Sequence, residues 1–389
     1  MRQLLTGARL FTGDTILDGH ALLVEGGKIV DLIPRQAAPQ AEIVPLPAGS
    51  LIAPGFIDTQ VNGGGGALLN DTPTPETVRT IVASHRRFGT TGLLPTFITD
   101  AADKMYAAAA VTAEVGREPA SGVLGLHLEG PFLSQERRGV HSPAFVRLPT
   151  DGDIAYLSEL PNAFPGGRLL LSLAPEAVTD ADIRKLADAG VLVAGAHSAA
   201  SHARTIEAIR AGLRGFTHLF NAMPPLANRE PAITGAALLS AETWCGIIVD
   251  GIHVHPAALK LALATKPRGK LMLVTDAMPP LGTDATSFQL YGATIHRRDG
   301  RLVTDDGTLA GADLDMAQAV RNCIGLLGLP REEALRMASL YPAEFLGMAD
   351  RRGRLAPGYQ ADLTLLDQGN HVLGTWVAGG WRTSDQIDA

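Results

Sequence analysis

The chain has 389 residues, and its 33 Lys and Arg against 40 Asp and Glu give a net charge of −7. Hydrophobic residues make up 46% of it and the mean hydropathy is +0.12, which excludes a disordered protein. The acidic balance excludes a charge field that would attract nucleic acid, and no stretch approaches ~20 apolar residues, as a membrane span requires. Two cysteines, Cys245 and Cys323, cannot build a disulfide framework, so we expect a cytoplasmic protein.

The two ends of the chain have similar sequence patterns. Short alternating runs broken by Gly fill residues 2–33, and similar runs return at 288–303 and 353–381; such runs are typical of strands joined by tight turns. We expect a small β-sandwich domain formed by residues 1–52 and 349–389. A larger domain over 53–348 is expected between them, with a possible β insertion near 286–305.

The central region alternates apolar runs with helical patterns. The runs predicted as buried strands are 54–59, 93–97, 123–129, 168–173, 191–196, 215–218, 246–249 and 271–275. The helices predicted between them are 74–88, 101–115, 179–189, 201–211, 231–241 and 256–265. About eight such units predict an α/β fold of the (β/α)₈ TIM-barrel type. A doubly wound open sheet is the alternative, but no Gly-x-Gly-x-x-Gly follows the first strand to support it.

Polar residues follow the ends of these strands, where a barrel carries its chemistry. Glu129, His197 and His218 end three separate strands, and one carboxylate with two imidazoles suits Zn²⁺ with a fourth position open for water. The alternative is that each His is a packed or capping residue, but burying three polar groups without a purpose is costly. The pattern therefore predicts a metal site.

Three more residues are candidates at the same end of the barrel. Asp276 follows the eighth strand and could move a proton between water and a leaving group, or else be a turn residue. His253 belongs to the only His-x-His of the chain, but the pair lies in a loop, so we expect substrate contact rather than metal binding. Arg229 lies in a Pro-rich loop and could clamp an anion, or else pair with Glu230.

The motifs and their order resemble a known family. ProGlyPheIleAsp at 54–58 looks like the first strand of the amidohydrolase superfamily. The segments LeuHisLeuGluGlyProPhe (126–132), ArgGlyValHis (138–141), GlyAlaHisSer (195–198), ThrHisLeuPheAsnAlaMet (217–223), AspGlyIleHisVal (250–254) and ValThrAspAla (274–277) resemble the N-acetylglucosamine-6-phosphate deacetylase family. The resemblance runs from about residue 7 to about residue 382, and the joint presence of these motifs is highly specific.

The resemblance implies a hydrolase that converts N-acetyl-D-glucosamine 6-phosphate to D-glucosamine 6-phosphate and acetate, in amino-sugar catabolism and cell-wall recycling. It implies one divalent metal ion per chain, Zn²⁺ by expectation, and a homodimer. The residues that match the family are Glu129, His197 and His218 as metal ligands, Asp276 as acid/base, His141 on the acetyl carbonyl, and Asn221, Ala222, His253 and Arg229 on the substrate. Arg229 matches a phosphate ligand that the neighbouring subunit could supply.

One position departs from many members of the superfamily. Where they carry His-x-His and bind two metals, this chain has Gln60 and Asn62, and amides are poor Zn²⁺ ligands beside imidazole. The second metal position is therefore predicted to be vacant. An N-acetylgalactosamine-6-phosphate deacetylase, another amidohydrolase, and a barrel that serves as an interaction scaffold remain alternative functions.

Overall fold

A computed structural model describes residues 2–37, 39–118 and 120–387. Its largest sheet has eight parallel strands in the order β17-β16-β15-β14-β13-β12-β11-β8. In chain order they are β8 (Phe56–Val61), β11 (Thr90–Ile98), β12 (Gly125–Glu129), β13 (Arg168–Leu173), β14 (Leu192–Gly195), β15 (Gly215–Phe216), β16 (Trp244–Ile247) and β17 (Leu271–Leu273). A parallel bridge between Val61 and Ala277 brings the last strand back to the first. The predicted TIM-type barrel is confirmed.

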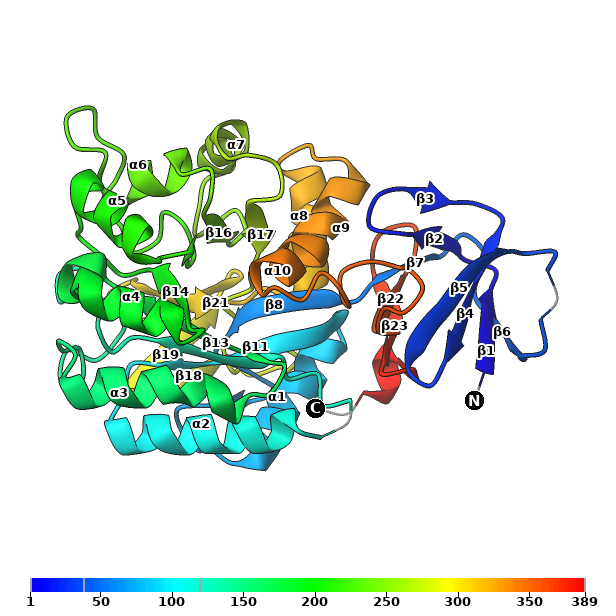
Figure 1. The fold of residues 1–389 in the computed structure, drawn as a ribbon, viewed down its shortest axis with the longest axis horizontal. Helices are drawn as coiled ribbons and strands as arrows, with labels where there is room; N and C mark the ends of the chain where they lie inside the picture. The colour runs from blue at the N-terminus through cyan, green and yellow to red at the C-terminus, as the bar shows by residue number, and fades with distance from the viewer. Residues whose placement is uncertain (1, 38, 119, 388–389) are drawn as a thin grey trace.

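Helices cover the outside of this barrel (Figure 1). They are α1 (Pro75–Arg86), α2 (Ala102–Gly116), α3 (Asp151–Glu159), α4 (Asp180–Asp188), α5 (His202–Ala211), α6 (Ala232–Leu239), α7 (Pro256–Thr265), α8 (Met316–Gly325), α9 (Arg331–Ala338) and α10 (Leu340–Phe345). Local side chains determine where several helices begin. The side chain of Ser201 caps α5, and Pro256 occupies the first turn of α7. The side chain of Thr179 caps α4, one residue before the helix begins at Asp180.

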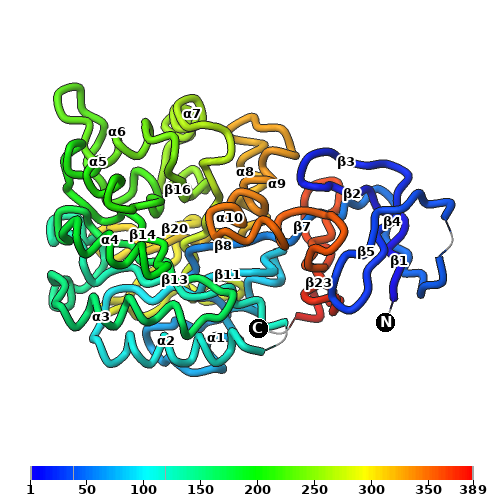
Figure 2. The backbone as a smooth tube through the Cα atoms, in the orientation of Figure 1, coloured from blue at the N-terminus to red at the C-terminus, as the bar shows by residue number. Residues whose placement is uncertain are grey.

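The two ends of the chain build a pair of smaller sheets beside the barrel. One contains β1 (Arg2–Thr6), β4 (His20–Glu25), β5 (Lys28–Pro34) and β6 (Glu42–Pro45). The other contains β2 (Arg9–Phe11), β3 (Ile16–Leu17), β7 (Leu51–Pro54), β22 (Leu363–Leu366), β23 (Val372–Val377) and β24 (Gly380–Thr383). Figure 2 shows the blue and red ends of the chain side by side. Leu10, Leu22 and Trp376 belong to the apolar core that these ends share, as expected for a sandwich.

Four antiparallel strands interrupt the chain after the eighth barrel strand. They are β18 (Ser287–Leu290), β19 (Ala293–Arg298), β20 (Arg301–Val303) and β21 (Leu309–Ala312). Ala312 N donates to the carbonyl oxygen of Asp276 at 2.9 Å, so the end of this sheet is fixed to the rim of the barrel. A two-stranded ribbon, β9 (Gly63–Gly64) with β10 (Ala67–Leu68), lies at the same rim. Short 3₁₀ turns cover Leu160–Ala163, Pro175–Ala177 and Ser384–Gln386.

Cys245 and Cys323 are both buried free thiols, as the apolar sequence around each of them suggests. Among the helices of the described residues, none has the length and apolar character needed to span a bilayer.

Candidate metal centre and active site

Three side chains from three strand ends meet at the mouth of the barrel. Oε1 of Glu129 lies 3.2 Å from Nε2 of His197 and 2.9 Å from Nε2 of His218. The two Nε2 atoms lie 3.0 Å apart. All three side chains are buried. The sequence prediction that these residues converge is thus matched by their positions.

This arrangement suits a divalent metal ion. Bonds of about 2.0–2.2 Å at tetrahedral angles put ligand atoms roughly 3.3 Å apart, close to the spacings found among Glu129, His197 and His218. Two imidazole nitrogens that face each other at 3.0 Å also need a shared cation or a proton between them, because both carry lone pairs in the neutral ring. The donor set of one carboxylate and two imidazoles is therefore one that can hold a metal.

The backbone is strained at these strand ends. His197, His218 and Asp276 have φ of 43°, 33° and 52°, in the left-handed region that non-glycine residues rarely adopt. Such conformations persist only where the surrounding structure enforces them, and they gather at functional sites. Here they turn three polar side chains toward one point above the barrel core.

Charge stabilises the carboxylate of the cluster. Burial works to raise the pKa of Glu129, but hydrogen bonds from His197 and His218 and their charges outweigh it and hold that pKa well below its usual range. Burial likewise opposes the charged form of His218, but its hydrogen bond with Glu129 gives a net rise in the pKa of His218. The cluster therefore holds an ionised carboxylate without any Lys or Arg.

Asp276 lies beside the cluster and is held by two amides. Nδ2 of Asn62 donates to Oδ1 of Asp276 at 2.6 Å, and Nε2 of Gln60 donates to the same atom at 3.1 Å. Nε2 of Gln60 also lies 3.3 Å from both oxygens of Glu129. Burial, followed by the charge of Glu129, raises the pKa of Asp276 to about 6, which is suitable for a group that takes and returns a proton near neutral pH.

His141 approaches the cluster from the loop after β12. Its ring packs edge-on against His197 with centroids 4.4 Å apart, and ligand atoms of Glu129, His141 and His197 lie within 4.8 Å of one another. Burial and the neighbouring His197 lower the pKa of His141 to about 3, so the ring is neutral. Its Nδ1 is buried without a partner. A neutral imidazole in this position can donate one hydrogen bond to a bound carbonyl.

His127, two residues before Glu129 in the sequence, is a structural histidine. It lies deeper in the barrel, where Nε2 meets Oγ of Ser172 at 2.7 Å and Nδ1 meets Oγ1 of Thr96 at 3.1 Å. Both ring nitrogens are satisfied by hydroxyl groups. The residue therefore packs beneath the metal centre rather than joining it.

A cavity of about 470 Å³ opens above these groups, within the usual size range of small-molecule sites. Asn221, Ala222 and His253 line it together with the metal cluster, His141, Asn62 and Asp276. Nδ1 of His253 is fixed by Oδ2 of Asp250 at 2.6 Å, which leaves Nε2 for a ligand. Nδ2 of Asn221 contacts the carbonyl oxygens of His218 and Leu219 at 3.1 and 3.4 Å, so its amide also fixes the loop.

Comparison with known proteins gives the family. The sequence matches the Amidohydrolase family over residues 51–382 and the NagA composite domain over residues 4–43. The chain belongs to the amidohydrolase family. The family region begins at β7 and ends in β24, so it includes the whole barrel and every candidate site residue of this amidohydrolase.

Its relatives are described as two related kinds of deacetylase. An N-acetylgalactosamine-6-phosphate deacetylase of Shewanella sp. (strain ANA-3) is 43% identical over 96% of this amidohydrolase and 94% of the relative. An N-acetylglucosamine-6-phosphate deacetylase of Haemophilus influenzae is 33% identical over 98% and 100%. The crystal structure of N-acetylglucosamine-6-phosphate deacetylase from Pasteurella multocida superposes with a TM-score of 0.94 at 34% identity, covering 98% and 100% of the two chains.

Arg229 is the one candidate that lies apart from the others in this amidohydrolase. It is exposed in the loop before α6, which projects from the barrel (Figure 1), and it is absent from the cavity wall that the described residues form. Glu230, the alternative partner considered from sequence, instead accepts hydrogen bonds from the backbone N–H groups of His202 and Ala232. Within one chain, Arg229 does not reach the metal centre.

Sequence reasoning missed part of the cavity wall. Val140, residues 307–309 and Gly311 line the amidohydrolase cavity, because the β20–β21 connection and the start of β21 lie over the barrel mouth. Gly311, with φ of 68°, lies so close to the rim that a Cβ there would meet Cγ of Met278 at 2.4 Å. The LeuAlaGlyAlaAspLeuAspMetAla motif at 309–317 was the available signal for this loop, but its place above the cavity is a long-range contact.

Proposed function

We propose that this amidohydrolase deacetylates N-acetyl-D-glucosamine 6-phosphate to D-glucosamine 6-phosphate and acetate. The observation that carries the proposal is the meeting of Glu129, His197 and His218 within 3.2 Å in a cavity whose wall also holds Asp276. The descriptions of the Haemophilus and Pasteurella proteins support the choice of substrate.

Glu129, His197 and His218 would hold one divalent ion, with Zn²⁺ favoured by the imidazole ligands. Such an ion, when bound, acidifies a water molecule and polarises a carbonyl oxygen. Gln60 and Asn62 would bind no second ion, because amides are poor Zn²⁺ ligands beside imidazole. Their amide nitrogens instead donate to Asp276 and Glu129. The second metal position is therefore proposed to stay vacant.

The protein residues then move one proton and stabilise one charge. Asp276 takes a proton from the water whose oxygen attacks the acetyl carbon. His141 donates a hydrogen bond to the carbonyl oxygen as that atom gains negative charge, a contribution that is usually large in such sites. Asp276 then gives the proton to the sugar nitrogen as the carbon–nitrogen bond breaks, leaving acetate and a free amine.

Substrate positioning falls to groups on the cavity wall and to a second subunit. Asn221, Ala222 and His253 face the same cavity as the metal cluster and would contact the sugar. Arg229 is exposed and outside that wall, so its expected role on the 6-phosphate requires a neighbouring chain. We therefore propose a homodimer in which each Arg229 serves the partner's cavity.

A second substrate is favoured by one finding. The Shewanella relative, at 43% identity, is described as an N-acetylgalactosamine-6-phosphate deacetylase. The two sugars differ in the orientation of one hydroxyl group, which the metal cluster does not contact directly in the proposed reaction. The N-acetylgalactosamine 6-phosphate reaction is the alternative function.

The test is acetate release from both 6-phosphates and from the two unphosphorylated sugars. We expect the highest kcat/KM for N-acetylglucosamine 6-phosphate. A higher value for the galacto epimer would select the alternative, and equal values with and without phosphate would contradict a sugar-phosphate enzyme.

A further inference from the structure

A second cavity lies at the opposite end of the barrel from the metal centre. It has a volume of about 190 Å³ and is bounded by the end of α2, the first residues of β12, the turn before β13 and the segment after α10. The amino-terminal ends of the strands open here, whereas the metal cluster occupies their carboxyl-terminal ends. No step of the proposed reaction uses this cavity.

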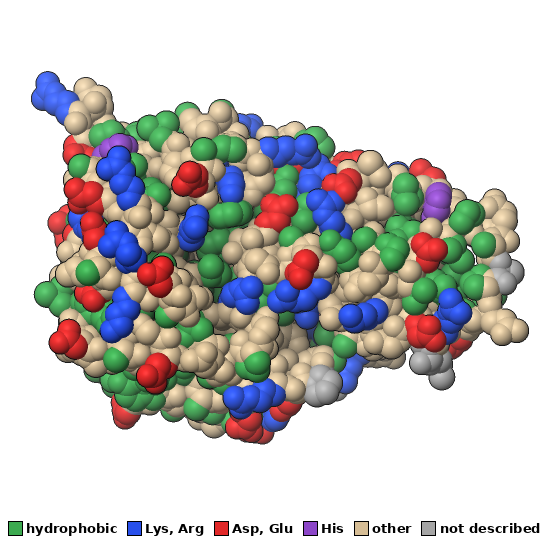
Figure 3. All heavy atoms as spheres, in the orientation of Figure 1, with side chains coloured by type: hydrophobic (Ala, Val, Ile, Leu, Met, Phe, Trp, Pro, Cys, Tyr) green, Lys and Arg blue, Asp and Glu red, His purple; other side chains and the backbone are tan. Residues whose placement is uncertain are grey.

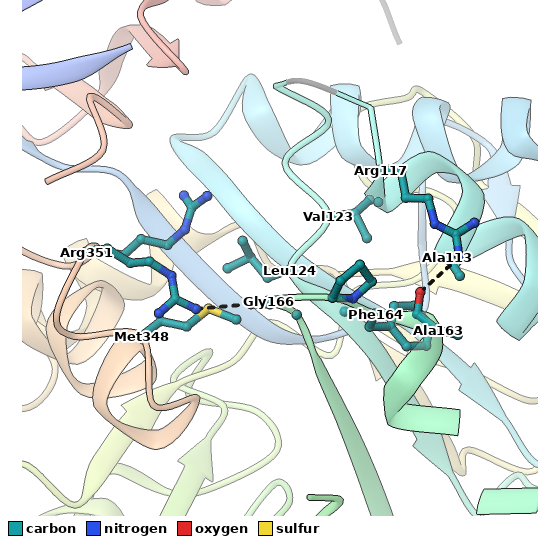
Figure 4. Close-up of a pocket in the computed structure, with 14 residues that line it drawn as sticks. Ala113, Arg117, Val123, Leu124, Ala163, Phe164, Gly166, Met348 and Arg351 are labelled. Carbon is teal, nitrogen blue, oxygen red and sulfur yellow. Dashed lines mark hydrogen bonds between the residues drawn. The ribbon is translucent and has the colours of Figure 1, made fainter. Parts of the chain in front are cut away.

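Arginines line the cavity on opposite sides. Figure 4 shows Arg117 on one side and Arg351 on the other, with Leu124 and Phe164 between them. Arg117 contacts the carbonyl oxygen of Ala163 at 3.4 Å, and Arg351 donates to that of Gly166 at 3.1 Å. Each guanidinium group is therefore held at the cavity edge by a backbone carbonyl oxygen, while other N–H groups remain for a ligand.

Two further arginines surround the same cavity. Arg352 lines it and pairs with Asp362. Arg168 adjoins it and donates to the carbonyl oxygens of Gly167 and Gly347 at 2.8 and 3.3 Å. Burial, followed by the charge of Arg351, lowers the pKa of Arg352 to about 10. Burial and the charge of Arg351 thus disfavour the charged form of Arg352, and an anion in the cavity would favour it.

Acidic groups only partly balance this charge. In the part of the chain that the structure describes, carboxylates pair with two of the four arginines: Asp350 with Arg351 and Asp362 with Arg352. No carboxylate lines the cavity among these residues. The two charges in excess belong to Arg117 and Arg168, and Arg351 is balanced only by the exposed Asp350, a surface ion pair of little strength. The excess matches in size, with opposite sign, the charge of a phosphomonoester near neutral pH. Figure 3 shows Lys and Arg gathered near the middle of one face, where the barrel meets the terminal sheets.

We propose that this cavity is a second ligand site, which binds a small phosphomonoester between Arg117 and Arg351. Guanidinium groups match phosphate oxygens in bidentate geometry, and the apolar wall of Val123, Leu124 and Phe164 suits the carbon skeleton of a small organic phosphate. Arg352, at the rim of the cavity, pairs with Asp362 just before β22 and so joins this rim to the terminal sheets.

The test counts bound phosphate by isothermal titration with inorganic phosphate. The full chain is compared with Arg117→Glu/Arg351→Glu and with Arg184→Glu, a charge reversal at an exposed position on α4. We expect the double variant to bind one phosphate fewer per chain than the other two, with unchanged deacetylation. This difference is expected whether or not the metal-centre cavity also binds phosphate, so it is independent of the proposed function. Equal stoichiometry in all three proteins would overturn the second site.

Two further measurements test the role of Arg117 and the class of the ligand. Arg117→Gln alone, at an exposed helix end, avoids a double charge reversal and should weaken phosphate binding at this site about tenfold; unchanged affinity would overturn the role of Arg117. Glycerol 3-phosphate should bind at least tenfold tighter than acetate at the site that the double variant loses. Acetate binding as tight as that of glycerol 3-phosphate would overturn the phosphomonoester class.

Discussion

Nδ2 of Asn62 donates a hydrogen bond of 2.6 Å to Oδ1 of Asp276. Asn62 stands where many amidohydrolases carry a metal-binding histidine, and here its amide supports the proposed acid/base instead. Hydrogen bonding to a carboxylate favours its ionised form, so this contact works against the burial that raises the pKa of Asp276 to about 6. The pair thus links the proposed vacancy of the second metal position to the basicity of Asp276.

Asn62→Leu tests this link. Removing the amide should raise the pKa of Asp276 further, because the ionised form loses its donor. At pH 6 a larger share of Asp276 is then protonated, and unable to act as a base, in the variant than in the unchanged protein. At pH 8 the difference is smaller. The acid limb of kcat/KM against pH should therefore move to higher pH, with activity partly recovered at pH 8. An acid limb that stays in place would mean that Asn62 does not tune Asp276.

Asp276→Asn tests the proton transfer itself. The amide keeps the size of the side chain but cannot take a proton from water, so kcat should fall by roughly 10²–10⁴-fold. Metal content, measured by elemental analysis, should remain that of the unchanged protein, because Asp276 is not among the three converging ligands. A near-normal kcat would assign the proton transfer to another residue.

Arg229→Ala tests the phosphate contact. A charge-assisted contact is worth about 1.5–3 kcal/mol, so kcat/KM for the phosphorylated sugar should fall about 10- to 100-fold. The unphosphorylated sugar should start poorer and barely change, and Arg184→Ala should leave both values unaltered. Because Arg229 lies outside its own cavity, activity per chain should also fall on dilution below the dimer's dissociation constant. Equal losses on both sugars would make Arg229 structural.

The titration of Asp58 is expected to make the free energy of unfolding depend on pH. Burial raises the pKa of Asp58 to about 7, despite hydrogen bonds from Thr275 and from the backbone. Between its ordinary value of 3.8 and about 7, the folded chain keeps this proton while the unfolded chain loses it. The contribution of Asp58 is therefore fully present below pH 3.8 and is lost as the pH rises toward 7.

Asp58→Asn removes that titration and can keep the same hydrogen bonds. Urea unfolding of the metal-loaded protein at pH 5 and pH 8 should show the variant gaining stability relative to the unchanged chain as the pH rises. Asp103→Asn, at an exposed position on α2, is the control and should show no such trend. A constant difference between Asp58→Asn and the unchanged chain would contradict a buried, protonated Asp58.

The barrel was predictable because its strands are apolar runs at regular spacing. Each of the eight expected runs contains or overlaps an observed barrel strand. Each of the six expected helices begins and ends within two residues of its observed counterpart; these counterparts are α1, α2, α4, α5, α6 and α7. α3 and α8–α10 were not among the expected helices. α9 and α10 are short, with 8 and 6 residues, and follow each other directly at Ser339, so neither gives a long helical pattern in the sequence.

The convergence of Glu129, His197 and His218 was predictable from strand ends, but its detail was not. The positive φ values of His197, His218 and Asp276 are enforced by surrounding tertiary contacts. The double use of Gln60, between Glu129 and Asp276, depends on strands at opposite ends of the sheet order meeting as the barrel closes. Neither the positive φ values nor the two contacts of Gln60 can be predicted from the spacing of residues in the sequence.

We propose that one metal ion, held by Glu129, His197 and His218, supports deacetylation. This is tested by titrating metal-free protein with Zn²⁺ while acetate release from N-acetylglucosamine 6-phosphate is measured. We predict activity that rises linearly and reaches its plateau at one Zn²⁺ per chain, and no such rise in His197→Ala. A plateau only at two Zn²⁺ per chain, or full acetate release by the metal-free protein, would contradict the account.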